Sequence, residues 1–374
     1  MIRILHYIGT LELGGSQAFV MELYRNMKRE EIQFDFVIFP EWRGPLYEEI
    51  IRMGGKVYES PKYNGINHME YVRWWQNFLN EHPEYQVIHG HVRSVASIYL
   101  PIVRKAGRYT ILHSHSMSNG HGFSALIKTM LQLPVRHMAD YYMACSDEAG
   151  RWLFGNQVVS GSRYRTIPNA INTSRFLYSE EQRMVIRKEL EANESFLIGH
   201  VGRFVEVKNH VFLIKLLEFI LDDKLISNPK LLLIGDGPLK TEMEQLVEKM
   251  GLVEHVIFVG NATDVERFYP GMDVFVFPSK WEGLGIAVVE AQTNGLECVI
   301  SEGIPDRVDI GAGLIRRATL ENMKEWAENL YLIYKQKKER RSYDFEAREA
   351  GYDIKSSALF MQEFYVEAFH KCVG

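Results

Sequence analysis

FPSKWEGLGIAVVEA, residues 277–291, passes from the end of an apolar strand through a glycine-rich turn into a helix expected to begin near Leu284. The backbone N–H groups in the first turn of such a helix lack helical partners, and the helix dipole adds positive potential there. The stretch therefore predicts an anion site built from main-chain amides.

Two acidic residues frame this turn. Glu282 precedes the expected helix, and Glu290 lies about two turns inside it, with seven residues between them. Such a pair can accept hydrogen bonds from two separated parts of one elongated ligand, and sugar hydroxyls suit both. A capping acid and an ordinary surface glutamate explain the spacing equally well, so the context has to decide between them.

Short apolar runs alternate with longer helical stretches along the whole chain. A first series comprises 2–7, 34–39, 56–59, 86–89, 109–113, 141–144 and 164–168, and a second comprises 196–201, 230–234, 256–259, 274–277, 298–300 and 313–316. Parallel strands need long crossovers and are buried on both faces, so this alternation predicts an α/β fold with two doubly wound sheets. The polar stretch after Tyr178 places the boundary there, giving domains 1–178 and 179–354.

Ligands of such sheets bind beyond the carboxyl ends of the strands, so the loops that follow strands are candidate sites. Arg203 and Lys208 follow the first strand of the second series and can converge on a diphosphate; a solvated basic turn is the alternative. Gly235 and Gly237 allow close backbone approach or make a simple tight turn.

In the first domain, Gly14 and Gly15 join a strand to a helix and would let amides approach a phosphate, with Ser16 as the expected N-cap. The chain contains neither GxGxxG nor GxxxxGK[ST], which argues against a simple dinucleotide dehydrogenase and against a P-loop NTPase.

Histidines crowd two neighbouring segments that follow strands. They are His89, His91, His113, His115 and His121. Alternate strand positions share a face, so a metal cluster or an imidazole that donates to a substrate is conceivable. For each single histidine a buried, hydrogen-bonded position is the simpler expectation, and no ligand set of fixed spacing is identified, so no metal is predicted.

Composition sets the remaining limits. The 374 residues carry 43 Lys and Arg against 48 Asp and Glu, which gives no overall attraction to nucleic acid. Three widely spaced cysteines favour a reducing compartment, and the lack of a signal peptide or a long apolar run predicts a cytoplasmic protein. The apolar stretch 122–138, with its basic residues, is expected to pack in the core, with peripheral contact to the membrane face as the alternative.

Together these motifs resemble the retaining, nucleotide-sugar-dependent glycosyltransferases of family 4, over nearly the whole chain. The matching motifs are Glu282-x7-Glu290 with Ala291 and Gly295, Gly202-Arg203 with Lys208-Asn209, Gly235-Asp236-Gly237-Pro238, Gly14-Gly15, and Ile167-Pro168-Asn169. The segment 112–115 is most similar to enzymes of bacterial capsular and exopolysaccharide clusters. Gln17 stands where the family has glutamate and Asn169-Ala170-Ile171-Asn172 where it has Asn-Gly-Ile-Asp, departures that bear on the acceptor side.

The resemblance implies a GT-B fold, in which two Rossmann-like domains face a cleft and a C-terminal helix, about 355–374, packs back on the first domain. It assigns donor diphosphate binding to Arg203 and Lys208, ribose hydroxyls to Glu290, the transferred sugar to Glu282, and the reacting centre to His113. The other donor-binding positions that it implies are Gly14, Gly15, Gly235, Gly237, Val259, Gly260, Gly283, Leu284, Gly285 and Ile286.

The expected activity is retaining transfer of a hexose from a nucleotide diphosphate sugar, with a uridine-linked donor expected, to a lipid-linked or polysaccharide acceptor. No metal or other cofactor is required, because fixed cations and helix-end amides stabilise the leaving diphosphate. Two alternatives stay open: a nucleotide-sugar epimerase that needs no acceptor, and an inactive donor-binding subunit that partners an active transferase.

Overall fold

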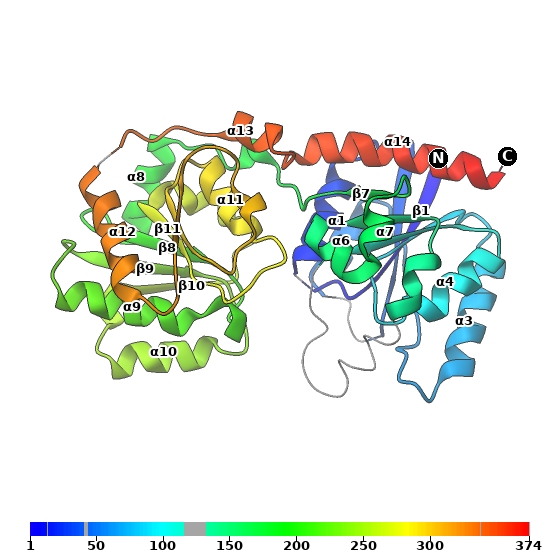
Figure 1. Ribbon diagram of the computed structural model, residues 1–374, viewed down its shortest axis with the longest axis horizontal. Helices are drawn as coiled ribbons and strands as arrows, with labels where there is room; N and C mark the ends of the chain where they lie inside the picture. Colours follow the sequence, from blue (N-terminus) through cyan, green and yellow to red (C-terminus); the bar gives the residue numbers. More distant parts are fainter. Residues whose placement is uncertain (13, 41–43, 116–131, 337, 374) are drawn as a thin grey trace. The chain divides into compact units, whose positions relative to one another are not determined.

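The computed structural model describes residues 1–12, 14–40, 44–115, 132–336 and 338–373 (Figure 1). Its contacts divide the chain into two compact units, unit 1 with Met1–Ile171 and Asp353–Gly374, and unit 2 with Asn172–Tyr352. Sequence patterns placed this boundary near Tyr178. In the structure Tyr178 belongs to unit 2, since its backbone N–H donates to Ser342 Oγ at 2.8 Å.

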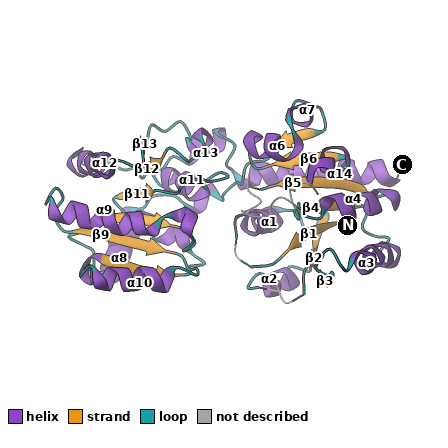
Figure 2. Ribbon diagram, turned by 60° about the horizontal axis from the view of Figure 1, so that its bottom comes forward, coloured by secondary structure: helices purple, strands orange, loops and turns teal. Residues whose placement is uncertain are grey.

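Unit 1 is built on a parallel sheet whose described strands run in the order β3-β2-β1-β4-β5-β6-β7 (Figure 2). The strands are β1 (Ile2–Gly9), β2 (Ile32–Ile38), β3 (Val57–Glu59), β4 (Val87–Gly90), β5 (Tyr109–Ser114), β6 (Tyr141–Ala144) and β7 (Tyr164–Thr166). The direction of winding reverses between β1 and β4, which makes the carboxyl ends of these two strands the switch point of unit 1.

Helices cover both faces of this sheet, because adjacent strand residues point to opposite sides. They are α1 (Gly15–Asn26), α2 (Tyr47–Arg52), α3 (His68–Glu81), α4 (Ala96–Lys105), α6 (Asp147–Phe154), α7 (Asn156–Val159) and α14 (Ile354–Val373). In β1, Ile4 lies in a core with α1 and α14, whereas Leu5 lies in a core with α3, α4 and α6. Helix α14 returns to unit 1 after Ile171 and Asp353 form a parallel bridge.

Unit 2 repeats the architecture with the strand order β10-β9-β8-β11-β12-β13 among its described residues. Its strands are β8 (Phe196–Val201), β9 (Pro229–Ile234), β10 (Val256–Gly260), β11 (Val274–Phe277), β12 (Cys298–Ser301) and β13 (Ile315–Ala318). Its helices are α8 (Glu180–Glu189), α9 (His210–Asp222), α10 (Lys240–Lys249), α11 (Ile286–Thr293), α12 (Met323–Gln336) and α13 (Asp344–Glu349). Here the switch point lies between β8 and β11.

Every predicted apolar run coincides with a strand, with small differences at the ends, so the prediction of two doubly wound parallel sheets is confirmed. The stretch 122–138 lies mostly outside the described residues, and its described end forms a short 3-10 helix, Leu133–His137. Across the described chain, none of the helices has the length and apolar character needed to cross a bilayer.

Two predicted helix starts are wrong by a residue or more. Helix α11 begins at Ile286, because Gly285 has a left-handed backbone (φ 84°) that a helix cannot include, and Glu290 therefore lies little more than one turn inside it. Helix α1 begins at Gly15 with Gly14 as its N-cap, and Ser16 lies inside the helix, where its hydroxyl donates to Gln17 Oε1 at 2.9 Å.

Candidate functional site

The loops after β8 and β11 meet at the switch point of unit 2 and are tied to each other. The backbone N–H of Lys280 donates to the Val207 carbonyl at 2.8 Å, and Asn209 Nδ2 donates to the Pro278 carbonyl at 3.2 Å. Asn209 adopts the left-handed conformation (φ 58°) just before α9 begins. The predicted basic loop and the predicted glycine-rich turn are therefore neighbours in space.

An ion pair between Lys208 and Glu282 forms the centre of this site. Lys208 Nζ donates to Glu282 Oε1 at 2.6 Å, and the two side chains are only 18% and 15% exposed. The ammonium also lies over the Phe277 ring, 4.5 Å from its centroid. Carboxylate and ring together hold the ammonium in a fixed place, and its hydrogen bond to Glu282 uses one of its three donors.

Arg203 lies on the same loop and is exposed, and within the described ranges no carboxylate forms an ion pair with it. The two cations therefore differ: Lys208 is held in position by Glu282, whereas the exposed Arg203 side chain is available to bind an anion. An arginine of this kind can bind a phosphate with two parallel hydrogen bonds.

Glycines make the close packing of these loops possible. A Cβ at Gly202 would lie 3.3 Å from Lys208 Cδ, so its absence gives the lysine stem room. A Cβ at Gly235 would lie 2.1 Å from the Gly202 carbonyl oxygen, and one at Gly237 would lie 2.6 Å from the Phe204 carbonyl oxygen. From the sequence, these glycines could allow a close backbone approach or simply form a tight turn. The structure shows that they allow the loop after β9 to contact the loop after β8.

Glu290 is held by a residue that sequence analysis missed. The Tyr269 hydroxyl donates to Glu290 Oε2 at 2.6 Å from a fully buried ring. Burial, followed by the charge of Glu290, raises the pKa of the Tyr269 phenol well above its usual range, so this hydroxyl keeps its proton. Tyr269 begins a short 3-10 turn, Tyr269–Gly271, and lies 21 residues from the glutamate, so the sequence gave no signal of this contact.

The other unit 2 positions that were predicted to bind the donor surround the same edge of the sheet. Gly283, Leu284, Gly285 and Ile286 form the turn into α11, and the Gly260 carbonyl, next to Val259, accepts from the Gly235 N–H at 2.8 Å. The structure thus brings all predicted unit 2 residues to the carboxyl ends of β8, β9, β10 and β11.

Two family profiles match the chain: "Glycosyltransferase Family 4" matches residues 13–175, and "Glycosyl transferases group 1" matches residues 182–350. The Bacillus subtilis (strain 168) protein named "Putative glycosyltransferase EpsF" is 33% identical over 97% of this chain and 96% of its own length. The chain belongs to the family 4 glycosyltransferases.

Further relatives of this transferase are more distant. The Staphylococcus aureus "Capsular polysaccharide biosynthesis glycosyltransferase CapH" is 22% identical over 98% of this chain and 99% of its own. An Escherichia coli enzyme named as a UDP-Gal:alpha-D-GlcNAc-diphosphoundecaprenol alpha-1,3-galactosyltransferase is 24% identical over 58% of each chain. Anabaena HepE, solved with UDP, superimposes with a TM-score of 0.78 over 98% of this chain and 100% of its own at 16% identity, which supports the GT-B fold.

The unit 1 candidates of the transferase lie at the carboxyl ends of its own sheet. His113 is the penultimate residue of β5, is fully buried, and has no hydrogen-bond partner for either ring nitrogen among the described residues. Burial lowers the pKa of His113 well below its usual value, so the imidazole ring is neutral near pH 7. A Cβ on Gly15 would reach no closer than 3.9 Å to Asn169, and one on Gly14 would lie 2.8 Å from Gln17 Oε1, the end of a flexible side chain. Gly14 has an ordinary extended backbone, so its φ angle does not require a glycine.

Proposed function

We propose that this transferase moves a hexose from a UDP-linked donor, with retention of configuration, to a lipid-linked or polysaccharide acceptor in polysaccharide biosynthesis. The names of relatives that build capsular polysaccharide or act on a diphosphoundecaprenol-linked sugar support the acceptor class. The UDP bound to Anabaena HepE supports the base of the donor.

The observation that carries the proposal is the Lys208–Glu282 pair at the switch point of unit 2, beside the N-terminal turn of α11. Negative charge builds up on the diphosphate as the bond to the sugar breaks, and fixed positive groups lower the barrier where that charge appears. In our proposal Lys208, Arg203 and the α11 amides supply this field, so the diphosphate needs no metal ion.

The two glutamates divide the rest of the donor between them. Glu290, fixed by Tyr269, accepts hydrogen bonds from the ribose hydroxyls. Glu282, fixed by Lys208, accepts a hydrogen bond from a hydroxyl of the hexose. Because Lys208 also binds the diphosphate in our proposal, the positions of the sugar and of the diphosphate are linked. We further propose that His113 contacts the transferred sugar as a neutral imidazole, and that the acceptor attacks from the face that the diphosphate leaves.

Calorimetric titration tests the donor site directly. UDP, GDP, ADP and their hexose conjugates are titrated into the protein with and without EDTA, and into K208M and the matched control K280M. Lys280 also pairs with a glutamate, Glu206, at 2.8 Å, but the two side chains are 45% and 86% exposed. We expect selective UDP binding that EDTA leaves unchanged, that K208M weakens and that K280M preserves.

Several outcomes would overturn parts of this function. Failure of every nucleotide to bind removes the donor assignment, and UDP binding without transfer to any acceptor favours the inactive subunit. Interconversion of the free UDP-hexose without acceptor favours the epimerase. A covalent glycosyl-enzyme, found by mass spectrometry after rapid quenching, would replace same-face attack by a double displacement.

A further inference from the structure

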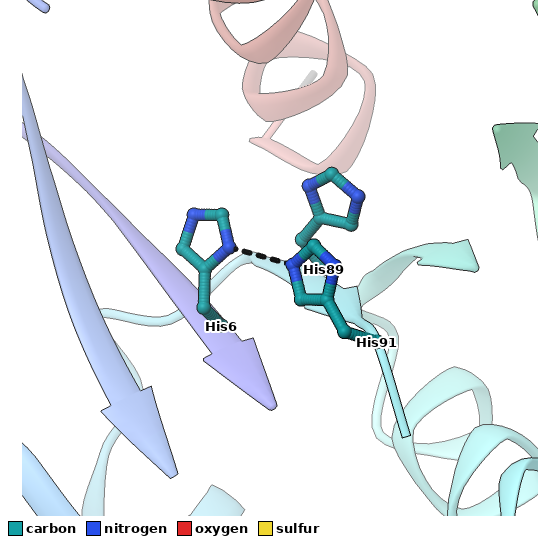
Figure 3. Close-up of side chains that lie close together, drawn as sticks. All are labelled: His6, His89 and His91. Carbon is teal, nitrogen blue, oxygen red and sulfur yellow. Dashed lines mark hydrogen bonds between the residues drawn. The ribbon is translucent and has the colours of Figure 1, made fainter. Parts of the chain in front are cut away.

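Three histidines converge at the switch point of unit 1, on or directly after strands that carry none of the predicted donor-binding residues of unit 2. His6 lies on β1 and pairs in register with His89 on β4, and His91 follows β4 directly. One ring nitrogen from each of the three lies within 4.8 Å of the other two. Figure 3 shows the three rings gathered between the ends of β1 and β4, below the helix α14.

These rings are buried, yet their hydrogen bonding is incomplete. His6 and His89 have no solvent exposure and His91 is 9% exposed. His6 Nδ1 lies 3.0 Å from His91 Nε2, but His6 Nε2 and His89 Nε2 have no partner in the part of the chain that the structure describes. Buried polar atoms left in this way cost folding free energy unless something binds them.

The His89 and His91 rings also have hydrogen-bond partners at their Nδ1 atoms, which fix the orientation of the rings. The Tyr365 hydroxyl on α14 lies 2.7 Å from His89 Nδ1, and His115 Nε2 lies 2.8 Å from His91 Nδ1. When these outer Nδ1 atoms carry the hydrogen, both Nε2 atoms present lone pairs. Histidines that bind metals are held by the same kind of outer hydrogen bond.

Protonation does not compete for these lone pairs near neutral pH. Burial lowers the pKa of His6 to about 3 and lowers those of His89 and His91 well below the usual value. The titratable group facing each ring is another histidine or a tyrosine, His6 also packs against Phe34 and Phe36, and the three-histidine group contains no carboxylate. Three neutral imidazoles suit Zn²⁺ and its neighbours and do not suit Mg²⁺ or Ca²⁺.

A second group, His91, His113 and His115, meets the same distance condition. It is the weaker candidate, because His113 lacks an outer partner for either nitrogen among the described residues, whereas His89 has Tyr365. His91 belongs to both groups, so the two cannot be filled independently.

We propose that His6, His89 and His91 bind one divalent transition metal ion, Zn²⁺ or a close first-row relative, through one ring nitrogen each. Three histidine ligands leave a fourth position for water or another small ligand. The site is built from unit 1 residues alone, whereas the donor diphosphate, which we propose to be bound without metal, is assigned to residues of unit 2. It does not depend on the transferase function.

The test uses the full chain after removal of metal with a chelator and exhaustive dialysis. Co²⁺ alone is titrated in, followed by absorption spectroscopy, and Zn²⁺ is then added in competition. We expect about one Co²⁺ per chain, visible d–d bands, and displacement by Zn²⁺. H6Q and H89Q should weaken binding at least 100-fold, and Y365F about 10- to 100-fold through the outer hydrogen bond.

H200Q is the matched control, since His200 is also fully buried with an unpartnered Nε2 among the described residues, but lies in unit 2. It should bind Co²⁺ like the wild type. H113Q separates the two histidine groups and should also bind normally. Circular dichroism of the metal-free variants checks folding, and X-ray absorption of the Zn²⁺-loaded wild type should show histidine nitrogens at about 2.0–2.1 Å.

The proposal fails if the wild type binds no Co²⁺ or Zn²⁺ at micromolar concentration, whatever the variants do. It also fails if H6Q binds as well as wild type, or if H113Q loses binding while H6Q keeps it, because the second group would then be the site. Absorption spectra with mainly oxygen neighbours would overturn it without recourse to any variant.

Discussion

Lys208 Nζ and Glu282 Oε1 lie 2.6 Å apart although 74 residues separate them in the chain. The pair exists because the loops after β8 and β11 meet at the switch point of unit 2. It sets the position of a cation before any ligand arrives, so a phosphate that binds there pays little of the entropy of ordering a lysine.

Replacing Lys208 by methionine should weaken UDP binding by about 1.5–3 kcal/mol, the usual contribution of a charged hydrogen bond. Methionine keeps most of the stem that packs beside Gly202, so the loss reports on the charge. Calorimetry measures the affinity, with K280M as control. Equal affinities for K208M and wild type would remove Lys208 from the site.

Tyr269→Phe should lower UDP affinity by about 1–3 kcal/mol, because Glu290 loses the hydroxyl that orients it. The buried ring itself is kept. Inorganic pyrophosphate serves as the control ligand, since it has no ribose and should bind Y269F and wild type alike. A parallel loss for pyrophosphate would mean that the variant disturbs the whole loop.

Gly235→Ala should destabilise unit 2 by about 2–5 kcal/mol, since its Cβ would fall 2.1 Å from the Gly202 carbonyl oxygen and φ is 140°. Gly311→Ala is matched for backbone strain alone: φ is 78° and nothing lies within 4 Å, so about 1–2 kcal/mol is expected. Urea unfolding of both variants measures the difference. Equal losses of stability in the two variants would mean that the loops after β8 and β9 can move apart to accommodate the added Cβ.

Acid should destabilise unit 2 through His200 and His210. Burial lowers the pKa of His200 well below its usual value and that of His210 to about 4, and Lys208 adds repulsion to both. In the unfolded chain the two histidines therefore bind protons near pH 6.5, whereas in the folded chain they stay neutral at that pH. The free energy of unfolding is therefore highest above pH 6.5 and falls as the pH drops below it. The slope should approach 1.4 kcal/mol per pH unit for each histidine.

Urea unfolding between pH 7 and pH 4.5 checks this prediction, with H200Q as the comparison. His200 Nδ1 donates to the Val276 carbonyl at 2.8 Å, a bond that glutamine can replace without titrating. H200Q should therefore lose less stability on acidification than wild type. An identical slope would assign the pH dependence to other groups.

Sequence patterns predicted the strands well, because buried parallel strands such as Val274–Phe277 are continuous apolar runs with clear polar borders. They also indicated Lys208, Glu282 and Glu290 as candidate site residues, because these lie in loops that follow strands or on the helix after such a loop. Tyr269 and Phe277 were missed as site residues, since each contributes through a tertiary contact that no local spacing encodes. Histidines at 89, 91, 113 and 115 drew attention, but His6, on a different strand, joined them only when β1 and β4 paired.

Helix α14 has a consequence for synthesis on the ribosome. Its residues Ile354, Ala358, Met361 and Tyr365 belong to the same core as β1 and α1, yet they emerge only after all of unit 2 has been made. Until α14 is made, a nascent unit 1 therefore has part of one face of its sheet uncovered, although α1 already packs there, and chaperones would be most needed during this interval.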